Sequence, residues 1–347
     1  MISATWLRDT TRAMALLLGA LVLAFAAQAV TAAPAAPAAD AAAVDAATAD
    51  AAAPAEDAAS GYTPLGPDMI KGQPTAYEDD PLKSMTFQDQ YNEIGAYALT
   101  MHDAILLPII TVISLFVLGL MLYVVVRFRR AANPVPSKTT HNTLIEVVWT
   151  VIPIIILLVI AVPSITLLAR QYESPPADAI TIKATGYQWY WGYTYPDQNM
   201  GEIISNMMPE DEAKAKGFPG QLEVDNRMVV PVGVPLRIQT TAADVIHAFA
   251  VPSLWFKLDA VPGRINEKML IIDEPGIYYG QCSELCGARH GYMPIAVEAV
   301  PMEQWRAWVR AQGGSFADEA AAAAAPAEAP AETAPEAGGD AAAAPAA

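Results

Sequence analysis

The sequence predicts a membrane-anchored all-β protein in which a two-helix transmembrane hairpin is followed by a Greek-key β-sandwich. Two uncharged apolar stretches lie within residues 104–168, and short β-rich runs separated by Pro, Gly and Asp fill residues 179–300. Of the 347 residues, 54% are hydrophobic, which indicates that part of the chain lies outside water. No helical heptad or internal repeat competes with this fold class.

Residues 1–29 have the pattern of a cleavable secretory signal peptide. Arg8 and Arg12 precede the apolar run AMALLLGALVLAFAAQAV, which contains a small-residue Ala-Gln-Ala pattern near its end. The alternative is an anchor helix that is not cleaved. A signal peptide would place the start of the mature chain outside the cytoplasm.

Two low-complexity segments, residues 30–60 and 315–347, consist mainly of Ala, Pro, Asp, Glu and Gly. They bury too little apolar surface to offset the entropy of ordering, so we expect both to be disordered. They contribute to a formal net charge of −17, which disfavours a nucleic-acid partner. An acidic surface instead suits a basic soluble partner.

Two apolar stretches, residues 104–126 and 147–168, are each near the ~20 residues needed to cross a bilayer. Prolines inside them are tolerated where neighbouring helices satisfy the freed backbone groups. The connection, residues 127–146, carries Arg and Lys but no acidic residue before its last position, so the positive-inside rule places it in the cytoplasm. Residues 61–103 and everything after the second span then lie on the periplasmic side, in agreement with the signal peptide.

Residues 179–312 are expected to form the periplasmic domain. Its strand-like runs are ITIKATG, YQWYWGYTY, RMVVPV, PLRIQTT, EKMLIID, GIYYGQC and MPIAVEAV, at spacings typical of a Greek-key sandwich. Residues 196–220 look like an insertion or a short helix between strands. The amphipathic stretch MEQWRAWVRAQ predicts a closing helix that ends at a Gly-Gly pair.

The stretch GQCSELCGARHGYMP contains both cysteines of the chain, Cys282 and Cys286, with His290 and Met293 close behind. An oxidising compartment favours a disulfide, but a bond between residues this close closes a very short loop with constrained geometry. A zinc site could use both cysteines, His290 and His247. It would leave Met293 unused, and soft ligands close together favour copper over zinc.

A mononuclear blue-copper site would use two histidines, Cys286 and an axial Met293, and would leave Cys282 unused. Two thiolates can instead bridge two copper ions, with one histidine and one weak axial ligand for each metal. This binuclear arrangement uses every soft group in the motif. A second axial ligand is missing from the side chains, and the backbone carbonyl of Glu284, between the cysteines, is the natural candidate.

Four blocks of the sequence resemble subunit II of cytochrome c oxidase, in the haem-copper oxidase superfamily. They are IEVVWTVIP, GYQWYWGYTYP, HAFAVPSLWFKLDAVPGRIN and YYGQCSELCGARHGYMP, and together they span residues 143–300. The resemblance implies a cupredoxin-like sandwich that accepts electrons from cytochrome c and passes them to haem in subunit I. Oxygen would be reduced to water there, coupled to proton translocation, in a complex that also contains subunit III. The implied location is the bacterial inner membrane, as a multi-pass protein in the lipid bilayer.

The resemblance also implies a ligand set for the binuclear copper A centre. It consists of His247, Cys282, the Glu284 carbonyl, Cys286, His290 and Met293. In addition, the Glu284 carboxylate would reach a magnesium or manganese ion at the contact with subunit I.

The resemblance assigns roles to residues outside the copper ligands. Trp189 would be the point at which electrons arrive from cytochrome c, although on pattern alone it is an aromatic at a strand end. Glu146 would lie at the mouth of a proton path leading into subunit I, the alternative being a water-exposed interfacial glutamate. Asp197 and Asp259 are candidates for an acidic docking face, although each could be a solvated turn residue. Many family members carry an acidic residue where this chain has Thr194.

Two rival functions remain to be weighed. Subunit II of a quinol oxidase shares the hairpin and sandwich but lacks the copper ligands, all six of which are present here. A copper storage or delivery module would bind metal without transferring electrons, and the second sulfur and the aromatic run at Trp189 disfavour it. Rapid reduction by cytochrome c would distinguish an electron-transfer subunit from a storage protein.

Overall fold

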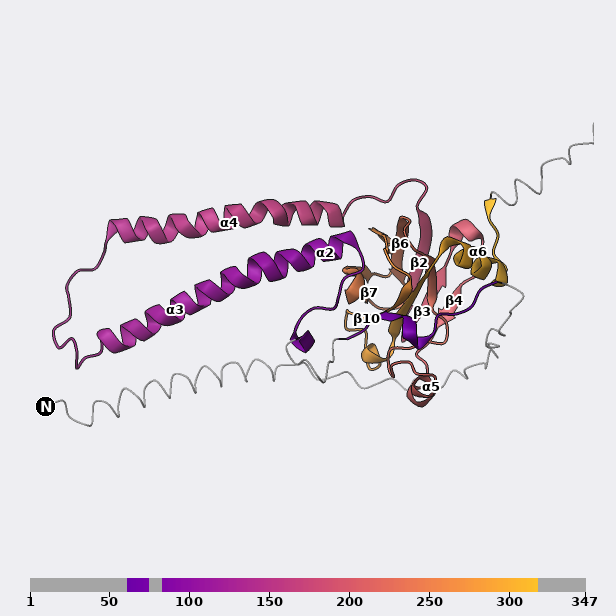
Figure 1. Ribbon diagram of the computed structural model, residues 1–347, viewed down its shortest axis with the longest axis horizontal. Helices are drawn as coiled ribbons and strands as arrows, with labels where there is room; N and C mark the ends of the chain where they lie inside the picture. The colour runs from indigo at the N-terminus through magenta and orange to yellow at the C-terminus, as the bar shows by residue number, and fades with distance from the viewer. Residues whose placement is uncertain (1–60, 75–82, 318–347) are drawn as a thin grey trace, which may run out of the picture. The chain divides into compact units, whose positions relative to one another are not determined.

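A computed structural model describes residues 61–74 and 83–317 of the chain (Figure 1). The predicted signal peptide, residues 1–29, and the predicted disordered segment, residues 30–60, lie outside the described residues. So does the predicted C-terminal tail from residue 318 onward. The described part consists of two long helices followed by a β-sandwich, which confirms the predicted fold class.

The first long helix runs without interruption from Glu93 to Arg127. It consists of α2 (Glu93–Thr100), a π-helical segment (Met101–Leu106) and α3 (Leu107–Arg127). The second is α4 (Thr143–Gln171). Both helices are long and apolar enough to cross a membrane, and they extend beyond the predicted spans at both ends.

The two helices begin at asparagine N-caps. The side chain of Asn92 accepts a hydrogen bond from the backbone N–H of Gly95, and that of Asn142 accepts one from Ile145, so that amides at each helix start have partners. Their central turns expose large apolar side chains on all sides, as expected for helices surrounded by lipid or by other membrane helices.

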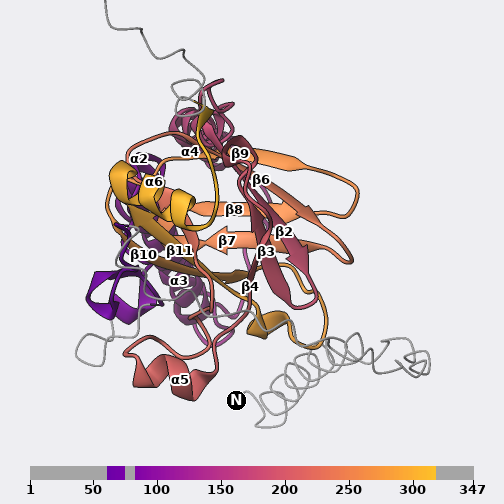
Figure 2. The same ribbon diagram turned by 90° about the vertical axis from the view of Figure 1, so that its right-hand side faces the viewer.

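The sandwich consists of two sheets, whose strands are labelled in Figure 1 and Figure 2. The first sheet has the order β5-β11-β10-β7-β8, and β1 pairs with the start of β10. Its strands are β1 (Ile70–Gly72), β5 (Met228–Pro231), β7 (His247–Val251), β8 (Phe256–Ala260), β10 (Gly276–Cys282) and β11 (Pro294–Val300).

The second sheet has the order β4-β3-β2-β6-β9. Its strands are β2 (Ile180–Tyr187), β3 (Tyr190–Thr194), β4 (Ile203–Ser205), β6 (Leu236–Ala242) and β9 (Asn266–Leu270). Most neighbouring strands are antiparallel, but β2 pairs with β6, β5 with β11 and β1 with β10 in parallel. The inward side chains of both sheets form one core that includes the fully buried Trp191, Tyr193 and Phe249.

Two helices complete the outer domain. The short α5 (Glu210–Ala215) lies in the predicted insertion, and α6 (Met302–Ala311) is the predicted closing helix, which is confirmed. Helix α6 buries Trp305 and Trp308 against the core. Phe316 packs on Trp305, with ring centroids 5.5 Å apart, although it belongs to the segment predicted to be disordered. An isolated aromatic in a low-complexity segment can be ordered when a hydrophobic partner lies within reach.

The strand pattern differs from the prediction in two respects. The run YQWYWGYTY is not one strand, because the chain turns at Gln188 and Trp189 between the antiparallel β2 and β3. Four strands, β1, β4, β7 and β8, were missed. Every residue of β7 is buried, so it shows no alternation of polar and apolar residues, and β1 and β4 are only three residues long.

A buried ionic cluster connects the N-terminal segment, residues 61–72, to the sandwich through hydrogen bonds. Arg227 lies between Glu223 and Glu298, with Nη2–Oε2 and Nη1–Oε2 distances of 2.8 and 2.9 Å. Arg227 also donates to the Leu65 carbonyl at 2.9 Å, and Glu298 accepts from the hydroxyl of Tyr62 at 2.7 Å. The cluster therefore joins three separate parts of the sequence.

Candidate metal centre

Two strands and one loop position the sulfur and imidazole groups. β10 ends at Cys282, and it pairs with the antiparallel β7, which starts at His247. The loop after β10 returns through a short 3-10 turn, His290–Tyr292, to Met293, directly before β11. The pairing of β10 with both β7 and β11 therefore brings residues distant in sequence to one end of the sheet.

The predicted copper ligands lie together at this end. Cys282 Sγ is 3.9 Å from His247 Nδ1 and 3.9 Å from Cys286 Sγ. Cys286 Sγ is 3.5 Å from His290 Nδ1 and 3.5 Å from the Met293 sulfur. The sixth group, the Glu284 carbonyl, accepts a hydrogen bond from Cys282 Sγ at 3.3 Å. His247, both cysteines and Met293 are buried.

The two cysteines are free thiols in this structure. Their sulfurs are 3.9 Å apart, whereas a disulfide bond requires about 2.05 Å. The ligand atoms of His247, Cys282 and Cys286 all lie within 4.8 Å of one another, a spacing compatible with shared metal coordination.

The donor set fits copper better than zinc. Two thiol sulfurs, two imidazole nitrogens and one thioether converge, and thioether is a soft ligand that suits copper. Met293 is 1% exposed and its sulfur points at Cys286, so it belongs to the cluster and not merely to the core. This contact is hard to account for in a zinc site made of the cysteines and histidines alone.

The two thiols differ in acidity. Burial opposes ionisation of Cys282, but its contact with His247 and backbone groups at Ala248 and Glu284 outweighs burial, so the pKa of Cys282 is lowered. Burial and then the negative charge of Cys282 raise the pKa of Cys286. A cation, as a metal would provide, would favour ionisation of the second thiol.

Asp244 holds His247 from the opposite side, a role that the sequence did not indicate. Its Oδ1 lies 2.9 Å from Nε2 of His247, so that Nδ1 is left facing the sulfurs. The carboxylate also accepts from the backbone N–H groups of Gln188 and Val245, both at 2.6 Å. Burial raises the pKa of Asp244, but these hydrogen bonds outweigh it and the pKa is lowered. A carboxylate that orients a ligating histidine in this way fixes its tautomer.

We expect Asp244→Asn to weaken copper binding about tenfold, because the amide is a poorer acceptor for the imidazole N–H. Competition with a chelator, followed by metal analysis, measures this. Glu202→Gln is the matched control, since Glu202 is bonded to the exposed Tyr187 hydroxyl and not to His247. Equal copper affinity in wild type and Asp244→Asn would contradict the role of Asp244.

Two tryptophans contact the ligand loop. The indole N–H of Trp189 donates to the carbonyl of Cys286 at 3.2 Å, and the Gln188 side chain donates to the same oxygen at 2.9 Å. Gly287 lies against the Trp189 ring, where a Cβ would come within 3.0 Å of it. Trp191 lies on the buried side, with its ring centroid 6.0 Å from that of His247. Trp189 itself is only partly buried, so it connects the surface with the ligand loop.

The structure places the remaining predicted residues away from the sulfur cluster. The Glu284 carboxylate pairs with Lys257 at 2.8 Å, and Asp259 pairs with the same ammonium at 3.1 Å. Asp197 accepts a hydrogen bond from the backbone N–H of Thr181 at 2.7 Å, while remaining exposed. These three carboxylates therefore have structural contacts within the domain.

Glu146 lies in the first turn of α4, whereas the outer domain follows the last turn of this helix. Its Oε1 accepts from the backbone N–H of Asn142 at 3.1 Å, while the Asn142 side chain accepts from Ile145 at 3.2 Å. This reciprocal arrangement resembles a capping box. A helix-capping contact is thus a structural reason for a carboxylate at this position.

Comparison with known proteins gives a consistent result. The family model "Cytochrome C oxidase subunit II, periplasmic domain" matches residues 180–300, and "Cytochrome C oxidase subunit II, transmembrane domain" matches residues 82–167. The probable cytochrome c oxidase subunit 2 of Rickettsia bellii is 51% identical over 67% of this chain and 86% of its own length. The mitochondrial cytochrome c oxidase subunit 2 of Glycine max is 44% identical over 65% of this chain and 58% of its own length.

Among solved structures, the chain is similar to the periplasmic domain of subunit II of cytochrome oxidase of Bradyrhizobium japonicum. The identity is 49%, the alignment covers 41% of this chain and 97% of that chain, and the TM-score is 0.38.

Proposed function

Because this chain belongs to the cytochrome c oxidase subunit II family, and so is a membrane-anchored subunit of a haem-copper oxidase, we propose that it carries electrons from cytochrome c to haem in subunit I. The observation that supports this most is the convergence of Cys282, Cys286 and the two histidines, with Met293, at one end of the sandwich. Oxygen reduction and the proton translocation coupled to it would take place in subunit I.

The residues that would hold two copper ions are His247, Cys282, the Glu284 carbonyl, Cys286, His290 and Met293. When bound, the copper pair would supply one-electron redox chemistry. The protein contributes rigidity, since His247 lies between the Asp244 carboxylate and the backbone of β2, where a Cβ on Gly186 would be 2.7 Å from the imidazole. Ligands fixed in this way rearrange little when the charge of the site changes.

Trp189 would connect cytochrome c with the centre. Its ring is partly exposed on one side and bonded to the Cys286 carbonyl on the other. Asp197 and Asp259, both exposed, would belong to the acidic surface that attracts a lysine-rich cytochrome. Such steering weakens as salt concentration rises. The Lys257 ammonium next to Asp259 reduces its local negative charge, so Asp259 would contribute less than Asp197.

Further roles of this chain are proposed on the family alone. The Glu284 carboxylate would bind magnesium or manganese at the contact with subunit I, exchanging Lys257 for the ion. Glu146 would lie at the mouth of a proton path, in addition to its capping contact. Subunit III would be a further partner, and the bacterial inner membrane the location, with the sandwich in the periplasm.

We expect Trp189→Phe to slow reduction by cytochrome c at least about tenfold, because the indole hydrogen bond to the Cys286 carbonyl is lost. Stopped-flow mixing of the reduced cytochrome with the assembled oxidase measures this rate. Copper content should stay at two ions per chain, since Trp189 is not a ligand. Tyr190→Phe is the control, because it removes only a hydroxyl from the neighbouring residue. If cytochrome c reduced Trp189→Phe as fast as the wild type, Trp189 would not be the point at which electrons enter.

A further inference from the structure

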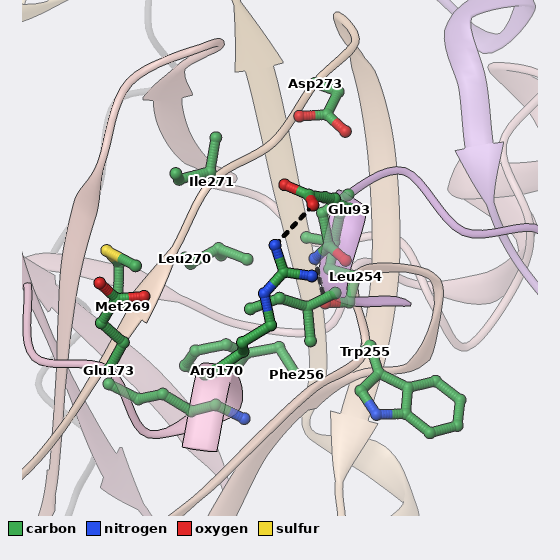
Figure 3. A pocket seen from close by; sticks show the side chains of 13 residues that line it. Glu93, Arg170, Glu173, Leu254, Trp255, Phe256, Met269, Leu270, Ile271 and Asp273 are labelled. Carbon is green, nitrogen blue, oxygen red and sulfur yellow. Dashed lines mark hydrogen bonds and ion pairs between the residues drawn. The ribbon is translucent and has the colours of Figure 1, made fainter. Parts of the chain in front are cut away.

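A cavity of about 220 Å³ lies between the membrane helices and the sandwich, and Figure 3 shows the side chains around it. Its walls come from the start of α2, the end of α4, and the segments of the sandwich that carry β8 and β9. Pockets for drug-sized ligands occupy about 300–1,000 Å³, so this one suits a smaller polar group.

The cavity is lined by both acidic and basic side chains. Arg170 and Glu93 form an ion pair at 2.7 Å, drawn as a dashed line in Figure 3. Glu173, Lys268 and Asp273 also line the cavity. Within residues 61–74 and 83–317, neither the Lys268 ammonium nor the Asp273 carboxylate makes a hydrogen bond or ion pair. One unpaired cation and one unpaired anion thus face the same space, with Glu173 as a further acid.

Burial opposes the charge of Lys268, and neighbouring acids add to a weaker effect of burial at the exposed Asp273. Lys268 lies over the rings of Phe256 and Tyr172, with its ammonium 5.2 and 5.7 Å from their centroids, and burial lowers its pKa. Asp273 lies beside Glu93, as Figure 3 shows, and burial followed by the charges of Glu93 and Glu274 raises its pKa. A bound anion would relieve the cost of desolvating Lys268, and a bound cation would offset the like charges around the exposed Asp273.

The position of the cavity indicates what could supply both counter-ions. Helix α4 carries no charged residue from Val147 to Leu168 and becomes charged at Arg170, where it lines the cavity. This change marks the level of lipid headgroups in a membrane-spanning helix. Trp255, which also lines the cavity, and the nearby Tyr172 are residue types enriched at that level.

We propose that this cavity binds the zwitterionic headgroup of a phosphoethanolamine lipid, with the phosphate against Lys268 and the primary ammonium against Asp273. An ammonium offers three hydrogen-bond donors to the carboxylates, and the phosphate offers acceptors to the lysine. A headgroup with a net negative charge and no amine would leave Asp273 and Glu173 unpaired. The lipid would then hold the membrane helices and the sandwich in a fixed register at the outer surface of the bilayer.

The test is native mass spectrometry of the assembled oxidase, titrated with short-chain phosphatidylethanolamine, with short-chain phosphatidylglycerol or with inorganic phosphate. Lipid retained on this subunit is counted after gas-phase dissociation of the complex. We expect the wild type to retain one phosphatidylethanolamine, and Lys268→Gln and Asp273→Asn each to weaken its binding about tenfold. Lys268→Arg keeps the cation and should retain the lipid. Retention would show that the loss of binding in Lys268→Gln comes from the lost charge and not from any change of residue at this position.

Lys214→Gln and Asp211→Asn on α5 are matched controls that should bind as the wild type does, because both residues are exposed and lie outside the cavity. Equal binding of phosphatidylethanolamine by the wild type and by Lys268→Gln would overturn the proposal. So would binding of phosphatidylglycerol or inorganic phosphate as tight as that of phosphatidylethanolamine, since either would indicate a simple anion site. A wild-type subunit that retains no lipid would also overturn it.

Discussion

Replacing Cys282 with serine is expected to lower the copper content from two ions per chain to one and to reduce electron transfer from cytochrome c by more than 100-fold. Serine is a hard, weakly acidic ligand that does not bridge soft metals as a thiolate does. Loss of residues that merely orient ligands costs about 10–100-fold in metal affinity or activity, so loss of a bridging ligand should cost more. Metal analysis and the paramagnetic spectrum measure the outcome.

The structure indicates which part of the site should survive in Cys282→Ser. Cys286 has its own contacts to His290 and to the Met293 sulfur, both at 3.5 Å, whereas Cys282 is the sulfur next to His247 and the Glu284 carbonyl. The remaining copper should therefore be held by Cys286, His290 and Met293. Its spectrum should be that of a single ion and not a signal shared over two.

Ser283→Ala is the matched control for this experiment. Ser283 is adjacent to Cys282 but exposed, and among the described residues its hydroxyl bonds only to the Gln281 carbonyl. It should retain two copper ions and normal reduction by cytochrome c. If Cys282→Ser also retained two ions with a shared signal, the binuclear model with bridging cysteines would be wrong.

The sequence predicted the fold class and the groups that the structure brings together at this site because both depend on local patterns. The two apolar stretches are recognisable by length, and Cys282, Cys286, His290 and Met293 lie on one short loop. His247 came from a different strand, but its block of sequence was distinctive. These features need no knowledge of how distant segments pack.

The sequence did not predict features that depend on packing between distant segments. Asp244 is an ordinary acidic residue in the sequence, and only the pairing of β7 with β10 shows that its partner His247 faces the sulfurs. The buried β7 has no polar and apolar alternation, so periodicity could not identify it. Arg227 likewise gives no local signal, because its partners lie before β1 and on β11 as well as nearby.

Arg227→Met is expected to reduce the free energy of unfolding by about 3–5 kcal/mol. The substitution keeps most of the side-chain volume but leaves Glu223 and Glu298, each with a side chain only 1% exposed, without their cation. Burial alone would lower the pKa of Arg227, but the two glutamates have a larger opposite effect, so the pKa is raised. The guanidinium therefore stays charged and remains the cation that pairs with both glutamates. Denaturant unfolding of the copper-free chain, followed by near-ultraviolet circular dichroism, measures the loss.

Arg264→Met is the control, since Arg264 is exposed on the loop between β8 and β9, and it should change stability by less than about 0.5 kcal/mol. Adding Glu298→Gln to Arg227→Met should recover part of the loss, because it removes one of the two unpaired buried charges. If Arg227→Met reduced the free energy of unfolding no more than Arg264→Met does, the ionic cluster would not stabilise the fold.

The same substitution should also release the N-terminal segment, because Arg227 donates to the Leu65 carbonyl and Glu298 accepts from Tyr62 and from the Leu65 amide. Limited proteolysis should then cut residues 61–72 faster in Arg227→Met than in the wild type. Since Glu298 lies on β11, which begins directly after Met293, loosening this strand should also weaken copper retention. Faster proteolysis with unchanged copper affinity would show that the ligand loop is stabilised independently of the ionic cluster.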